Sequence, residues 1–185
     1  SNEVWVAAGS YAPFNMDQTH DGLRVYGGFA GNETSRHARP AFPRTNPYYL
    51  ATRIGSGTAS YSPIRVSNCT SPTTRIDGFL IVDSKSSGIY CYKSNAVIAN
   101  NTILSCLGGD GGGIYLREGS PVVLNNRITG CHATRGGGIY AASTAEGTMI
   151  ANNTIVANLS VAYDRQTAAG AGMFFYYATA QAVNN

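Results

Sequence analysis

Short apolar segments recur along this chain at a fixed spacing. Apolar and other residues alternate within each segment, as at Ile114 and Leu116, which is the period of a β-strand. The segments open on a Gly-Ile-Tyr triplet that repeats every 25 residues, with a variant after 34: Gly88-Ile89-Tyr90, Gly113-Ile114-Tyr115, Gly138-Ile139-Tyr140 and Gly172-Met173-Phe174. A repeat of this length that holds several short strands indicates a solenoid.

A second marker keeps the same register. It is a pair of asparagines that recurs once per repeat: Asn100-Asn101, Asn125-Asn126, Asn152-Asn153 and Asn184-Asn185. We expect the first residue of the pair (Asn100, Asn125 and Asn152) to adopt the left-handed conformation at a sharp turn. We expect the side-chain amides of the same three residues to hydrogen-bond along the stack. Gly78 occupies the same place in the earlier segment Ile76–Ile81. The glycine runs 111–113 and 136–138 are expected to turn the chain into the next strand, where positive φ costs glycine little.

These markers predict an all-β fold, a single-stranded right-handed parallel β-helix of about six to seven coils. Residues 1–185 form one domain in this interpretation, and two loop excursions, 32–61 and 158–171, interrupt the stack. Equivalent residues of consecutive coils should lie about 4.8 Å apart. A leucine-rich repeat would need a recurrent leucine frame, which the chain lacks. Because Asn184-Asn185 falls in mid-repeat, we expect a fragment of a longer protein, with an open last coil that favours end-to-end self-association.

Composition narrows the classes of partner. Charged residues make up 12% of the chain and the net charge is +3, with no dense cluster of Lys and Arg. Nucleic-acid binding usually needs such a cluster, so we expect no nucleic-acid partner. No apolar run reaches the roughly 18 residues of a membrane span, so we expect no membrane insertion.

The first segments resemble a known family. Glu3-Val4-Trp5-Val6-Ala7-Ala8-Gly9-Ser10-Tyr11 and Val25-Tyr26-Gly27-Gly28-Phe29-Ala30-Gly31-Asn32-Glu33-Thr34 are similar to the opening of large bacterial secreted and surface proteins of the pectin-lyase-like superfamily. The Ile76-Asp77-Gly78-Phe79 segment and the Gly-Ile-Tyr coils resemble their later repeats. The resemblance implies a β-helix in an extracytoplasmic, secreted or cell-surface protein. It implies no single activity, because the superfamily includes polysaccharide lyases, glycosidases and adhesins.

The aromatic residue of each Gly-Ile-Tyr marker suggests a binding surface. If Ile points inward, its neighbour points outward, so Tyr90, Tyr115, Tyr140 and Phe174 should form an exposed stack. Tyr92, Arg117 and Tyr176 follow two positions later on the same face. An aromatic strip beside Arg can serve as a platform for sugar rings. Alternatively, it is an aromatic ladder that stabilises the sheet. Arg127 also points outward and could bind an acidic sugar.

No catalytic constellation is evident in the sequence. A glycosidase needs two positioned carboxylates, and the Asp-Asp pair and Gly-His-Gly motif of polygalacturonase-type enzymes are absent. His20, His37 and His132 are isolated in the sequence. Lys85, Asp110 and Arg135 stand three residues before successive markers and predict a column of ion pairs. We therefore expect no catalytic residue, no metal site and no cofactor; calcium would enter only in a polysaccharide lyase.

The cysteines leave two alternatives open. Cys106 and Cys131 occupy the same place in consecutive repeats, where stacking would bring their Cα atoms within disulfide range. They form either a disulfide, which suits an oxidising compartment, or a buried sulfur ladder. Cys91 should face the core, and Cys69 has no evident partner.

Together these features favour a structural or adhesive β-helical module that contacts a polysaccharide or cell-surface glycan. A polysaccharide lyase or another carbohydrate-active enzyme is the first alternative, so the sequence leans toward a non-enzyme without deciding the point. A phage fibre or tailspike segment is the second alternative, and it would be a trimer.

Overall fold

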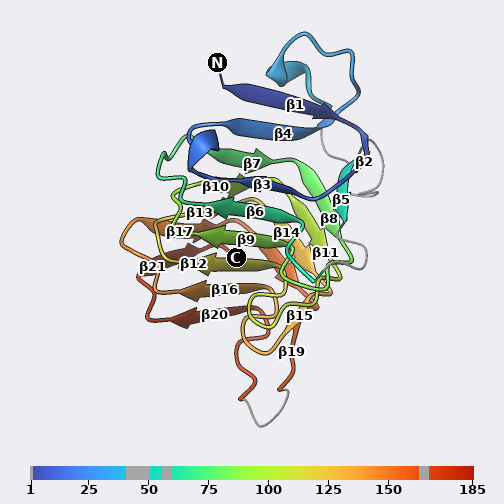
Figure 1. The fold of residues 1–185 in the computed structure, drawn as a ribbon. Coiled ribbons are helices and arrows are strands. Elements are labelled where there is room, and N and C mark those ends of the chain that lie inside the picture. The colour runs from blue at the N-terminus through green and yellow to red at the C-terminus, as the bar shows by residue number, and fades with distance from the viewer. Residues whose placement is uncertain (1, 41–50, 56–59, 163–166) are drawn as a thin grey trace.

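Three long parallel sheets run along the molecule in the computed structural model, which describes residues 2–40, 51–55, 60–162 and 167–185. In each coil the chain passes through sheet A, then sheet B, then sheet C, and moves on to the next coil (Figure 1). Every strand pairing in these described ranges is parallel. This is the right-handed parallel β-helix that the repeat predicted, with six coils and the first strand of a seventh.

The strands are short, as the sequence segments require. Sheet A contains β1 (Glu3–Ala7), β4 (Arg24–Phe29), β7 (Arg75–Asp77), β10 (Val97–Ala99), β13 (Val122–Leu124), β17 (Thr148–Ala151) and β21 (Ala180–Val183). Sheet B contains β2 (Gly9–Tyr11), β5 (Thr52–Gly55), β8 (Phe79–Val82), β11 (Thr102–Leu104), β14 (Arg127–Thr129) and β18 (Thr154–Val156). Sheet C contains β3 (Phe14–Met16), β6 (Ile64–Ser67), β9 (Ile89–Tyr92), β12 (Ile114–Arg117), β16 (Ile139–Ala142) and β20 (Met173–Tyr176).

Four minor elements of the described residues lie outside these sheets. β15 (His132–Ala133) pairs with β19 (Leu159–Ser160), and two single 3₁₀ turns, η1 (Gln18–His20) and η2 (Arg36–Ala38), lie near the N-terminal end. The prediction of loop excursions was wrong at two strands, since β5 lies inside 32–61 and β19 lies inside 158–171. The pattern did not reveal these strands, because each contains only one alternation of apolar and polar residues. Positions 41–50, 56–59 and 163–166 of the two excursions lie outside the described residues.

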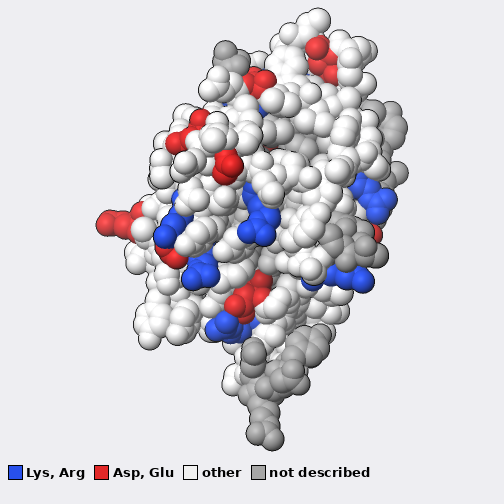
Figure 2. Space-filling view, viewed as in Figure 1, with Lys and Arg blue, Asp and Glu red and all other residues white. Residues whose placement is uncertain are grey.

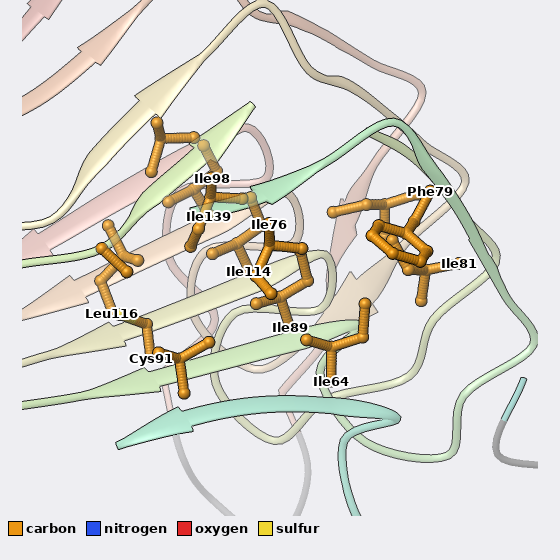
Figure 3. Packing of buried hydrophobic residues seen from close by; sticks show 14 of the residues in the cluster. Ile64, Ile76, Phe79, Ile81, Ile89, Cys91, Ile98, Ile114, Leu116 and Ile139 are labelled. Atoms are coloured by element: carbon orange, nitrogen blue, oxygen red, sulfur yellow. The ribbon is translucent and has the colours of Figure 1, made fainter. Parts of the chain in front are cut away.

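The core consists of columns of equivalent residues. Ile89 pairs in register with Ile114, which pairs with Ile139, and all three side chains are fully buried. Figure 3 shows these isoleucines close together among the other core side chains, which come from all three sheets. Cys91 lies in the next inward column beside Leu116, as expected. Equivalent inward positions of consecutive coils therefore form continuous apolar columns.

The two asparagines of each pair have different roles. Asn100, Asn125 and Asn152 have φ values of 56°, 55° and 57°, so they turn the chain in the left-handed conformation as predicted. The amide ladder, however, is formed by the second residue of each pair: Asn101, Asn126, Asn153 and Asn185. The prediction that the first residue forms the ladder was wrong, because its left-handed backbone brings the following side chain, and not its own, into the coil.

Glycines permit the turns into sheet C. Gly111 and Gly136 have φ values of 59° and 62°, as expected for these runs. Gly113 is required for a different reason, since a Cβ there would lie 2.7 Å from the Gly138 carbonyl oxygen and would also collide with Ile128. The glycine run thus supplies both a turn and a close approach between coils.

Candidate ligand-binding face

The outer face of sheet C brings together most of the predicted ligand-binding residues. Tyr90, Tyr115, Tyr140 and Phe174 pair in register as one outward column. Tyr92, Arg117, Ala142 and Tyr176 form the second column on the same strands. Figure 2 views the molecule from this side and shows several Lys and Arg side chains over the face, with Asp and Glu between them. The strand register therefore places these side chains on one continuous surface.

The tyrosines of the first column touch from coil to coil. Ring centroids lie 5.2 Å apart between Tyr90 and Tyr115 and 5.1 Å apart between Tyr115 and Tyr140. Tyr140 and Phe174 stack with 5.7 Å between centroids. These are favourable aromatic separations, so the column stabilises the sheet across strands. The aromatic ladder of the sequence interpretation is present.

The expectation of an exposed stack was wrong at Tyr140. Its exposed fraction is only 2%, whereas Tyr90 and Tyr115 remain half-buried. The Arg135 guanidinium lies 5.0 Å from the centre of the Tyr140 ring and 5.9 Å from that of Tyr176, and Phe174 stacks beside Tyr140. This cover removes Tyr140 from the surface that a ligand can reach.

A charge pair holds Arg135 in that position. Its guanidinium donates two hydrogen bonds to the Asp110 carboxylate, at 2.8 and 2.7 Å, from the adjacent coil. This part of the predicted Lys85, Asp110 and Arg135 column is confirmed. Lys85 is exposed and takes no part in the ion pairs found among the described residues. The Asp110–Arg135 pair is bidentate, which favours a structural clamp over a mobile ligand contact.

Basic side chains cover the open part of the aromatic face. Arg65 lies 5.3 Å from the Tyr90 ring centre, and Lys93 and Arg117 lie 5.3 and 5.5 Å from that of Tyr92. Each distance is within the range of a cation–π contact. The rings of Tyr90 and Tyr92 are themselves stacked, with centroids 6.2 Å apart. The result is a patch of half-buried tyrosines with three cations at its surface.

The charges on this patch are partly balanced. Glu118 lies 3.6 Å from both Lys93 and Arg117. A hydrogen bond with Tyr92 raises the pKa of Lys93, so its ammonium group stays charged at neutral pH. Burial raises the pKa of Tyr115, which therefore remains a neutral hydroxyl that can donate a hydrogen bond. The chemistry available is anion pairing, hydrogen bonding and contact with flat apolar rings.

Sequence reasoning missed two residues of this patch. Arg65 and Lys93 were not predicted, although the alignment of Ile64 with Ile89 places Arg65 directly beside Tyr90. Arg127 is exposed, as expected, but it lies on β14 of sheet B and outside the sheet C face. Aligning the repeats one coil further toward the N-terminus would have identified Arg65.

Comparison with known proteins agrees with this architecture. The family model described as "Right handed beta helix region" matches residues 49–185, about three quarters of the chain. The chain belongs to this family. No curated protein and no solved structure gives a significant match to it.

Outside the sheet C face, the described ranges of the chain hold little that could form another kind of functional site. No three His, Cys, Asp or Glu side chains gather there in a way that could hold a metal ion. The His20 side chain hydrogen-bonds within its own turn, where its Nδ1 lies 3.4 Å from the Asp17 backbone nitrogen, 2.9 Å from the Asp17 carboxylate and 3.1 Å from the Thr19 hydroxyl. In the same ranges no helical turn has the length and hydropathy of a membrane span.

Proposed function

We propose that this β-helix is a non-enzymatic module of a bacterial secreted or cell-surface protein, of pectin-lyase-like lineage, that contacts acidic glycans. The contact surface is the basic tyrosine patch on the outer face of sheet C, formed by Arg65, Tyr90, Tyr92, Lys93, Tyr115 and Arg117. Its extracytoplasmic location is supported by the resemblance of the first coils to secreted and surface proteins.

One observation carries the proposal. Three half-buried tyrosine rings lie side by side on a rigid sheet with three cations over or beside them. Tyrosine faces offer flat apolar area to sugar rings, and guanidinium groups pair with carboxylate or sulfate through two hydrogen bonds. A neutral sugar would use only the rings, whereas an acidic glycan would use both.

Arg65 is the strongest candidate for direct contact with an anion. It is exposed, and it takes no part in the ion pairs found among the described residues. Arg117 and Lys93 share Glu118, so a ligand would have to compete with that carboxylate for them. We therefore assign the main anion contact to Arg65 and supporting contacts to the other two.

The test is a calorimetric titration of the chain with polygalacturonate oligomers, with a neutral galactan as the reference. We expect binding of the acidic polymer that weakens with salt and falls by about tenfold or more in Arg65→Ala, equivalent to about 1.4 kcal/mol. Arg127→Ala is the matched control, since it removes the same charge from sheet B. Circular dichroism of each variant verifies that the coils remain folded.

Three outcomes would contradict the proposal. Equal affinity for the acidic and neutral polymers, or an equal loss in Arg65→Ala and Arg127→Ala, would remove the sheet C patch as the contact surface. Appearance of the ultraviolet absorbance of unsaturated sugar products, with or without added calcium, would replace the non-enzymatic module with a polysaccharide lyase.

A further inference from the structure

Cys106 and Cys131 lie directly above one another in consecutive coils. β11 and β14 end in register at Leu104 and Thr129, and Leu107 pairs with His132 immediately after the cysteines. The backbone N–H of His132 donates to the Cys106 carbonyl oxygen at 2.8 Å. The ordinary strand spacing of about 4.8 Å places the two Cα atoms within the range that a disulfide spans.

Both cysteines are free thiols, and both side chains are fully buried. Each thiol donates to a carbonyl oxygen of its own coil, Cys106 to Leu104 at 3.4 Å and Cys131 to Thr129 at 3.6 Å. The interaction between the two cysteine side chains lowers the pKa of Cys131 and raises the pKa of Cys106. A Cβ at Gly88 would lie only 3.2 Å from the Cys106 sulfur, so that sulfur packs closely against the residue that precedes β9.

The other two cysteines lack such an arrangement. Cys91 pairs in register with Val66 and Leu116, neither of which is a thiol. The Cys69 thiol donates to the Asp17 carbonyl oxygen at 3.1 Å. Burial raises the pKa of Cys91 to about 12 and that of Cys69 to about 11, so both remain protonated at neutral pH. They serve as an internal comparison for the stacked pair.

We propose that Cys106 and Cys131 are a redox site, a dithiol that a small-molecule disulfide oxidises to a bridge between two consecutive coils while the chain folds, before both sulfurs are buried. The Cys131 thiolate attacks one sulfur of the oxidant, forms a mixed disulfide and releases one thiolate. The Cys106 thiol then loses its proton, and its sulfur attacks Cys131 and releases the second thiol. Two protein thiols are oxidised and one external disulfide is reduced to two thiols, so electrons and protons balance.

The bridge would act as a clamp across one coil. It closes a loop that contains β12, β13 and β14, so it restricts the unfolded chain over one full turn of the solenoid. Separation of these coils would then require reduction as well as unfolding. The site is independent of the sheet C patch and of the glycan proposal.

The test begins with fully reduced chain that is refolded with oxidised glutathione as the oxidant, and a parallel sample is treated after folding. Free thiols are alkylated, and mass spectrometry of the peptides locates any bridge. We expect a cross-linked peptide pair that contains Cys106 and Cys131, with Cys69 and Cys91 alkylated. We also expect a higher thermal midpoint of the oxidised protein that reverses on reduction.

One variant tests the stacked pair, and a second variant at another cysteine serves as its control. Cys131→Ser should abolish both the cross-link and the redox-dependent shift in thermal midpoint, while Cys69→Ser should leave both intact. Recovery of Cys106 and Cys131 as alkylated thiols after refolding with oxidised glutathione would overturn the proposal. A bridge between Cys69 and Cys91 in their place would also overturn it.

Discussion

The Asn101 side chain donates its amide to the Asn126 side-chain oxygen at 3.0 Å, across one coil of the solenoid. The same oxygen also accepts the backbone N–H of Asn101 at 3.0 Å, and the Asn126 amide continues to Asn153. Each member of the ladder thus satisfies backbone and side-chain groups that the turn would otherwise bury without partners. The exposed fractions of Asn101 and Asn126 are each 1%, so water cannot replace these bonds.

Asn126→Ala should therefore destabilise the protein by more than about 3 kcal/mol, because several buried polar groups lose their partners. The expected readout is a lower urea midpoint with loss of β-sheet circular dichroism. Asn125→Gly is the control, since Asn125 is exposed and its φ of 55° suits glycine, and it should change stability by less than about 1 kcal/mol. Equal effects of the two substitutions would contradict the ladder.

Gly113→Ala should cost about 1–3 kcal/mol, since its methyl group would overlap Ile128 and the Gly138 carbonyl. Gly109 precedes it in the same turn and has nothing within 4 Å of the position of a Cβ. Gly109→Ala should be neutral or should stabilise by up to about 1 kcal/mol, because it restricts the unfolded chain. Thermal unfolding of the two variants measures the difference, and a reversed order would refute the close approach of coils at Gly113.

The buried thiols predict a loss of stability at alkaline pH. Burial raises the pKa of Cys91 from its ordinary value of 9.0 to about 12, so below pH 9 the thiol is protonated in both folded and unfolded chains. Between pH 9 and 12 it ionises only in the unfolded chain, which favours unfolding. Urea midpoints should fall from pH 8 to pH 10, and the fall should be smaller in Cys91→Ala. An identical pH slope in both proteins would show that Cys91 titrates normally in the fold.

Much of the architecture follows from the sequence because the core repeats in columns. The 25-residue period alone is enough to align Ile89, Ile114 and Ile139, since each inward position needs the same apolar shape. β5 was not predicted, because a long segment interrupts its coil. In addition, Thr52-Arg53-Ile54-Gly55 contains only one alternation of apolar and polar residues. Periodicity identifies repeated strands well and isolated ones poorly.

The binding face was predictable only in outline. Alternation placed Tyr90, Tyr115 and Tyr140 outward, but it could not show that Arg135 covers Tyr140, because that contact depends on the path of the turn before β16. Alternation also could not show which asparagine of each pair turns the chain and which one forms the amide ladder, since both positions favour Asn. Such contacts depend on backbone dihedral angles and on side-chain reach, which spacing does not encode.

The last coil should favour self-association. Phe175 pairs in register with Ala141, which is fully buried, yet the exposed fraction of Phe175 is 39%. The strands β18, β20 and β21 are the edge strands of their sheets at this end of the molecule. Sedimentation velocity should show species that grow with concentration, and Phe175→Asp should suppress them. Leu107→Asp, at an exposed site in the turn between β11 and β12, is the control. A single monomer at all concentrations would contradict this prediction, and a discrete trimer would favour a fibre segment.

The most direct test of the stacked columns is a methyl nuclear Overhauser experiment on protein labelled at its isoleucines. Residues 25 positions apart should show strong cross-peaks, Ile89 with Ile114 and Ile114 with Ile139, because consecutive coils lie about 4.8 Å apart. Absence of both cross-peaks in the folded protein, or contacts of these three methyl groups in a different register, would contradict the account.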